Sequence, residues 1–146
     1  METVSRPDGG GAPARIRFLL WADVLLFAYG ALSHAYDLAA RGWPPYPAAG
    51  PGSNAFWAAL GPIDALVAWL LVVRTRAGLL VGAAVLGVDV PLNAYEVLGR
   101  AGVAPANAGG FWRLVAVLGW FVVTAPAIWR RTAAAGPWRT PGGGPR

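Results

Sequence analysis

Residues 77–98, AGLLVGAAVLGVDVPLNAYEVL, decide how this chain folds. The stretch is long and apolar enough to cross a bilayer as a helix, which takes about 20 residues. At about 100° per residue, one face of that helix is small at one end and acidic at the other. The members of this face are Gly78, Gly82, Val85, Asp89, Asn93 and Glu96. Because a carboxylate at the bilayer centre costs about 2.5–3.5 kcal/mol, other helices must cover this face.

The composition indicates a polytopic membrane protein. The 146 residues are 56% hydrophobic and only 13% charged, with a mean hydropathy of +0.48, whereas soluble domains carry about 25% charged residues. The net charge is +5, but all 12 basic residues are Arg and lie in the tails or at the ends of apolar blocks. Anionic lipid headgroups explain this charge better than nucleic acid, which we exclude as a partner. The excess of Ala, Gly, Pro and Arg over Lys suggests a bacterial genome, and hence the bacterial inner membrane.

The apolar blocks predict an all-α, four-helix transmembrane bundle over residues 15–131. The predicted helices cover residues 16–39, 54–73, 77–98 and 111–129. The short turn at residues 74–76 makes the second and third helices an antiparallel hairpin, and Ser53 or Asn54 is expected to cap the second. The tails, residues 1–14 and 132–146, are rich in Gly and Pro and are predicted to be disordered.

The distribution of arginine predicts the orientation of the bundle. Three arginines, Arg41, Arg100 and Arg113, fall on one side. Nine fall on the other: Arg6, Arg15, Arg17, Arg74, Arg76, Arg130, Arg131, Arg139 and Arg146. The positive-inside rule then places both termini in the cytoplasm.

Helix rise predicts a polar cleft that opens to the outside. Asp64 lies about 15 Å inward from the outer end of its helix, and Asp89 about 18 Å outward from the inner end of its helix. In a core about 30 Å thick, the two acids share one layer. His34, Asp37, Asn93 and Glu96 lie nearer the outer surface, and we expect these four residues and the two acids to form a ligand-binding site. Asp23 lies alone near the cytoplasmic side and would be a step in a proton path.

This arrangement allows three functions. Two buried carboxyl groups at one depth do not both ionise cheaply, so we expect Asp64 and Asp89 to share a proton. Our first hypothesis is a cleft that binds a small apolar or amphiphilic ligand, with cationic ligands among the candidates, and it requires a closed inner half. The second is a small proton-coupled transporter, which requires a route past Asp23 and works as a homodimer, with Gly78 and Gly82 at its seam unless they pack the second helix. The third is a structural subunit of a membrane complex, in which paired acids join helices without any cavity.

Catalytic and metal-binding motifs give little support to other functions. His34 and Asp37 share a helix face and could bind a metal together with Glu96. His34 is the only histidine and there is no cysteine, so we predict neither a metal nor a cofactor. The sequence contains no phosphate-binding loop and no nucleophile elbow, and we assign no catalytic residue.

The polar pattern of the first three helices resembles that of small, uncharacterised bacterial four-helix membrane proteins. It consists of Ser33-His34 and Asp37, one acid in the second helix, and Asp89-x-x-x-Asn93 in the third. More distantly it is similar to the EXPERA class, which includes emopamil-binding sterol isomerases and bundles that bind amphiphilic amines in an acidic cavity. The resemblance covers residues 16–98. Asp64 is the only acid in the second helix and the fourth helix has no counterpart, so the resemblance implies no catalytic residue here.

Overall fold

The computed structural model describes residues 14–134, which fold into four long helices. These are α1 (Ala14–Arg41), α2 (Pro51–Val73), α3 (Thr75–Asn93) and α4 (Gly109–Ala134). A π-helix, η1 (Ala94–Arg100), continues α3, and a 3-10 turn, η2 (Pro105–Asn107), precedes α4. The predicted all-α, four-helix class is confirmed, and each helix is long and apolar enough to cross a membrane. The tail predictions fall mostly outside the described residues, but α4 continues to Ala134, past its predicted end at residue 129.

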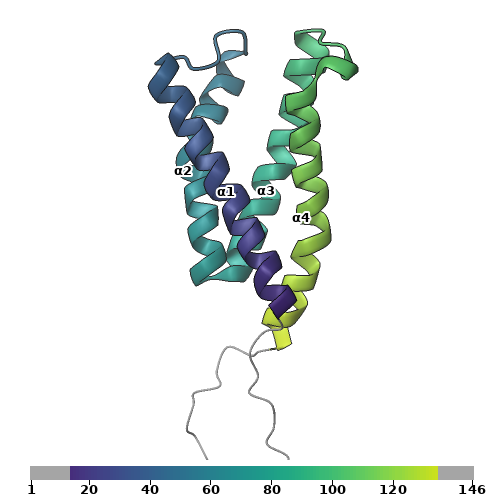
Figure 1. Cartoon of the computed structure of the whole chain (residues 1–146). Helices are drawn as coiled ribbons and strands as arrows, with labels where there is room; N and C mark the ends of the chain where they lie inside the picture. Colours follow the sequence, from purple (N-terminus) through teal and green to yellow (C-terminus); the bar gives the residue numbers. More distant parts are fainter. Residues whose placement is uncertain (1–13, 135–146) are drawn as a thin grey trace, which may run out of the picture.

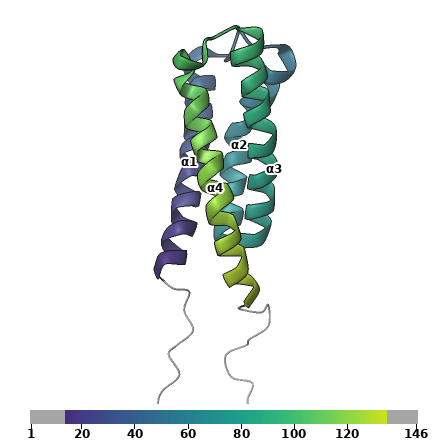
Figure 2. The same ribbon diagram turned by 90° about the vertical axis from the view of Figure 1, so that its right-hand side faces the viewer.

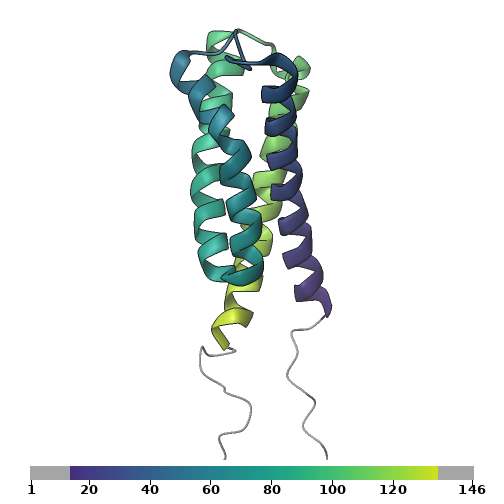
Figure 3. The same cartoon turned by 90° about the vertical axis from the view of Figure 1, so that its left-hand side faces the viewer.

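The helices form a ring in chain order, in which α4 returns to contact α1. The start of α1 and the end of α4 lie at one end of the bundle, which we call the terminal end (Figure 1). The α1–α2 and α3–α4 connections both lie at the opposite end, which we call the loop end (Figures 2 and 3). Toward the loop end, α1 and α2 diverge from α3 and α4, while α1 crosses toward the end of α4 at the terminal end (Figure 1).

The apolar core fills the terminal half of the ring. Its buried members are Val24, Phe27, Val67, Ala68, Leu71, Leu79, Leu86, Phe121 and Ile128. Phe27 of α1 and Phe121 of α4 meet edge to face, with ring centroids 5.7 Å apart. A Cβ atom on Gly82 would lie 2.9 Å from the Phe27 ring and 3.1 Å from the Phe121 ring. The absence of a side chain on α3 therefore makes room for this aromatic pair.

Gly78 brings α3 against α2 directly after the hairpin turn. A Cβ atom at this position would lie 2.5 Å from the backbone nitrogen of Leu71. Gly78 and Gly82 therefore both pack inside the chain. The homodimer seam that we expected at these two glycines is already used by α2 and by the Phe27–Phe121 pair.

We expect Gly78→Ala to lower the free energy of unfolding by about 1–3 kcal/mol, because the added methyl group overpacks a contact with backbone atoms that cannot move aside. Gly87→Ala is the matched control, since no atom lies within 4 Å of a Cβ at Gly87. Unfolding of both variants in mixed micelles gives the comparison. Equal stabilities for the two variants would contradict the close approach of α2 and α3.

The end of α3 departs from a regular helix. Pro91 lies inside α3 and has no backbone N–H, and the π-helical turn begins three residues later, at Ala94. A π-turn closes between residues i and i+5, so its residues are offset from the α-helical repeat. Glu96 is therefore displaced from the face that a uniform period of 100° per residue predicts.

The fold places the start of α1 and the end of α4 on the same side of the membrane. Which side this is follows only from the distribution of arginine. We expect a reporter fused after Arg146 to be cytoplasmic and a tag inserted at Ala48, in the α1–α2 connection, to be accessible from outside. Labelling of intact cells with an impermeant reagent measures both. If the tag at Ala48 were protected from the reagent and the reporter were external, the predicted orientation would be wrong.

Candidate functional site

A cavity of about 240 Å³ lies among all four helices on the loop side of the Phe27–Phe121 pair. It contacts both carboxyl groups that helix rise placed in one layer, Asp64 of α2 and Asp89 of α3. Most of the remaining lining is apolar and comes from α1 and α4: Leu26, Phe27, Tyr29, Gly30, Leu114, Val117 and Phe121. The acids thus belong to the wall of the cavity, and the two phenylalanines separate it from the core.

Asp64 differs from the other acids of the bundle because it has no partner. Its residue surface is only 7% exposed, yet within residues 14–134 it makes neither a hydrogen bond nor an ion pair. A Cβ atom on Gly30 would clash with Asp64 Oδ2, so a larger residue at this position of α1 would displace the carboxyl group. Its carboxyl group faces the cavity, which Arg113 also lines without forming an ion pair with it. A carboxylate in such surroundings is stabilised by a proton or by a cation that enters the cavity.

Asp89 is held in place by two donors. Its Oδ1 accepts hydrogen bonds from Trp57 Nε1 at 3.0 Å and from Asn93 Nδ2 at 2.8 Å. Asn93 therefore supports Asp89, one helical turn away, and both residues also line a second pocket of about 380 Å³ closer to the loop end. Asp64 and Asp89 contact the same cavity without a hydrogen bond between them in the described structure.

The second pocket joins the cavity at His34, Asp89 and Leu114, which line both. Its polar wall includes an arrangement that spans the α1–α2 connection. The Tyr46 hydroxyl donates to Asp37 Oδ2 at 3.0 Å and lies 2.9 Å from His34 Nδ1. The side-chain amide of buried Asn54 bonds to both backbone groups of Tyr46: it donates to the Tyr46 carbonyl and accepts from the Tyr46 N–H.

This arrangement determines which ring nitrogen of His34 remains available. Burial, together with the nearby Asp37 carboxylate, raises the pKa of Tyr46 well above its ordinary value, so the phenol keeps its proton. The phenol has one proton and donates it to Asp37, so it must accept a hydrogen bond from His34 Nδ1–H. In a neutral imidazole, Nε2 is then an unused acceptor beside the two pockets.

Glu96 lies apart from the residues with which the sequence grouped it. It lines neither of the two pockets; its carboxylate accepts from Ser53 Oγ at 2.5 Å and from Gly50 N at 3.2 Å, at the start of α2. Arg100 pairs with it at 2.6 Å. The helix dipole favours a carboxylate at this helix start. Our expectation that Ser53 or Asn54 caps α2 is wrong, because α2 begins at Pro51 without a side-chain cap from its own sequence.

The sequence suggested that Asp23 lies alone, but the structure gives it two partners. It is fully buried between α1 and α4, where Trp120 Nε1 donates to its Oδ1 at 2.8 Å. Thr124 Oγ1 lies within 3.2 Å of both carboxyl oxygens. Phe27, one helical turn from Asp23, lines the cavity together with Phe121. Asp23 is thus a polar contact between α1 and α4 on the terminal side of this pair.

Sequence reasoning missed four residues of the site: Tyr46, Asn54, Trp57 and Arg113. Arg113 lines the cavity from α4, and its Nε donates to the Gly109 carbonyl of its own helix at 3.3 Å. The other three form hydrogen bonds between elements: Tyr46 bonds to Asp37 of α1, Asn54 to the Tyr46 backbone, and Trp57 to Asp89 of α3. A buried Asn and a Trp in the first turns of a membrane helix are the signal that could have pointed to them.

Among residues 14–134, no group of three His, Asp or Glu side chains is arranged to hold a metal ion. By the length and composition of its four helices, the chain is a multi-pass membrane protein. Comparisons with protein-family models, curated proteins and solved structures found no match. The resemblance to the EXPERA class therefore stays a prediction.

Proposed function

We propose that this protein binds a small ligand with a protonated amine in the cavity between its four helices, with Asp64 and Asp89 as the charge partners. The observation that carries the proposal is the unpartnered carboxyl group of Asp64. Of the five acids in the described chain, the other four are bonded by neighbouring side chains. Asp64 alone is left for something that enters the cavity.

The chemistry of the surrounding groups supports a ligand that donates hydrogen bonds. Asp64, the second oxygen of Asp89 and Nε2 of His34 in its neutral form are acceptors, and among the described residues Arg113 is the one cationic side chain of the lining. An ammonium group offers up to three donors to these acceptors. The apolar wall supplied by α1 and α4 suits a hydrocarbon portion. Binding pockets of this kind combine an apolar lining with a few convergent polar groups.

The apolar core in the terminal half favours binding over transport. A proton path past Asp23 would have to cross the Phe27–Phe121 pair and the buried core, where Val67 and Leu71 are fully buried. A purely structural role for the acids predicts paired carboxyl groups without a cavity. It would leave both the cavity and the unpartnered Asp64 without an explanation.

Isothermal titration of the purified protein in detergent with butylamine and butanol tests the proposal. An alkylamine is a cation at pH 7, since its pKa resembles that of lysine, about 10.4, whereas the alcohol is similar in size and uncharged. We expect Asp64→Asn to weaken butylamine binding at least tenfold, or by about 1.4 kcal/mol. Butanol should bind equally to both proteins.

Glu96→Gln is the matched control, because it makes the same acid-to-amide change outside the cavity and should retain amine binding. The proposal would be overturned if the wild-type protein bound no amine. It would also fail if Asp64→Asn and Asp89→Asn both kept the wild-type affinity.

A further inference from the structure

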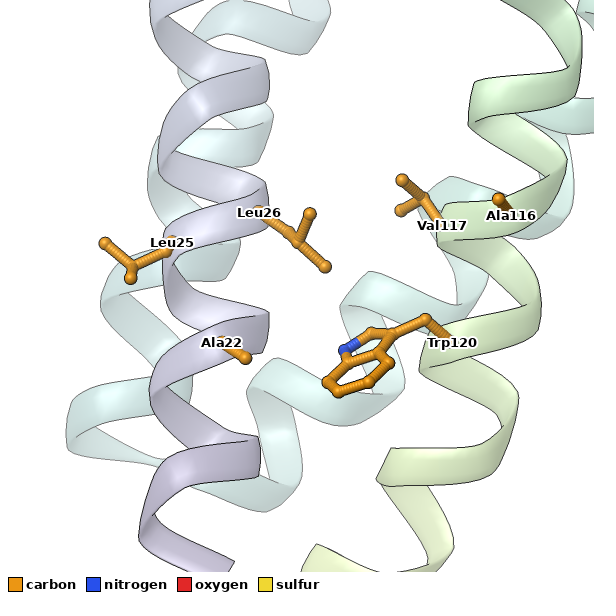
Figure 4. Close-up of a pocket in the computed structure, with 6 residues that line it drawn as sticks. All are labelled: Ala22, Leu25, Leu26, Ala116, Val117 and Trp120. Atoms are coloured by element: carbon orange, nitrogen blue, oxygen red, sulfur yellow. The ribbon is translucent and has the colours of Figure 1, made fainter.

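An apolar groove on the outside of the bundle adjoins the cavity. The groove has a volume of about 480 Å³ and is lined by Ala22, Leu25, Leu26, Ala116, Val117 and Trp120. Leu26 and Val117 line both spaces, so these two side chains form the boundary between the cavity and the groove. Figure 4 shows Leu26 of α1 and Val117 of α4 extending toward each other across the gap between the helices.

The floor of this groove is held in place from beneath. The Trp120 ring reaches from α4 toward α1 on the terminal side of Leu26 and Val117 (Figure 4). Its Nε1 donates to the fully buried Asp23, which fixes the indole against the bundle. The small side chains of Ala22 and Ala116 leave the space above the ring open. The hydrogen bond to Asp23 thus maintains a groove on the surface that faces the bilayer.

The cavity alone is too small for most ligands. Its 240 Å³ is below the range of about 300–1,000 Å³ that is typical of ligand pockets. A larger ligand must extend either toward the loop end or into the groove. The loop-end pocket presents His34, Asp37, Tyr46 and Asn93. A hydrocarbon chain there would exclude water from the Asp37 carboxylate and from Nε2 of His34, which is costly. The groove offers apolar side chains, and its far end at Ala22 lies about 12 Å along α1 from Gly30 of the cavity.

We infer that the ligand is a single-chain cationic amphiphile that enters from the bilayer. Its ammonium group lies at Asp64 and Asp89, and its alkyl chain passes between Leu26 and Val117 into the α1–α4 groove. This inference rests on the proposed function and adds the class of ligand and its route. Because lipid tails are as apolar as the groove, the groove provides an exit for the chain rather than a large gain in affinity.

Variants that fill the groove test the site of the alkyl chain separately from the site of the ammonium group. We use the protein in lipid nanodiscs, with empty nanodiscs subtracted, and measure saturable binding of dodecylamine and butylamine. Val117→Trp fills the junction between cavity and groove, and Ala116→Phe fills the groove beyond it. Val123→Trp is the matched control, since Val123 is 74% exposed on α4 and lines neither space.

We expect dodecylamine to bind at least tenfold more weakly to both blocked variants, and butylamine to bind within twofold of wild type to Ala116→Phe. The control should bind both amines normally, and butylamine should displace dodecylamine from the wild-type protein. Unchanged dodecylamine binding to both blocked variants would overturn the inference while leaving the proposed function intact. So would loss of both amines from both variants, or wild-type protein that binds butylamine and excludes dodecylamine. If the wild-type protein bound neither amine, the proposed function itself would fail.

Discussion

Asp64→Asn is expected to leave the empty protein as stable as wild type or more stable, whereas Asp89→Leu is expected to lower the free energy of unfolding by about 1–3 kcal/mol. The difference follows from their partners. Asp64 has none in the described structure, so the amide removes a group that is costly to bury and keeps its shape. Leucine at position 89 leaves the buried Trp57 Nε1–H without an acceptor. Asn93 would still donate to the backbone carbonyl of residue 89.

A thermal-shift series on Asp64→Asn, Asp89→Asn, Asp89→Leu and the Asn double mutant measures this prediction. If the two carboxyl groups interact across the cavity, the Asn substitutions should be non-additive. Strictly additive effects would show that the two acids do not sense each other. A destabilisation by Asp64→Asn as large as that by Asp89→Leu would mean that Asp64 has a structural partner, and the case for a ligand at Asp64 would then fail.

The fold could be read from the sequence because bilayer thickness imposes it. Each apolar block is long enough to span, and the short turn at Arg74 leaves α2 and α3 no choice but an antiparallel hairpin. The predicted helix ends differ from the observed ones by a few residues. Those differences lie mostly where connections meet the helices, where polar residues can either continue a helix or end it.

Helix rise also predicted that Asp64 and Asp89 lie at the same depth, and both contact one cavity. The prediction succeeded because both residues lie in regular stretches of helix. It failed for Glu96, since the π-turn after Pro91 offsets this residue from the repeat, and no periodic rule contains that offset. Tyr46 was missed for a different reason. Its position depends on hydrogen bonds to Asn54 and Asp37, and such contacts between a connection and two helices have no periodicity.

The polar contact between α1 and α4 at the terminal end provides the second large effect. We expect Asp23→Leu to lower the free energy of unfolding by about 1–3 kcal/mol, because the Trp120 indole N–H would lose its acceptor among apolar neighbours. Thr124 would lose less, since its hydroxyl lies 3.3 Å from the carbonyl of Phe121 and can donate there instead. Asp23→Asn keeps an acceptor of the same shape and should cost less than about 1 kcal/mol.

Trp120→Phe separates the stability cost of the unpaired indole N–H from the other costs of leucine at position 23. This substitution keeps a ring at the floor of the groove and removes the donor, so Asp23→Leu combined with Trp120→Phe should recover most of the stability that Asp23→Leu loses. Reversible unfolding in mixed micelles measures all four proteins of the cycle. If Asp23→Leu were as stable as wild type, the hydrogen bond from Trp120 would not hold α1 to α4. If the double mutant were no more stable than Asp23→Leu, the loss would come from packing around position 23, and the indole could adopt another orientation in the groove.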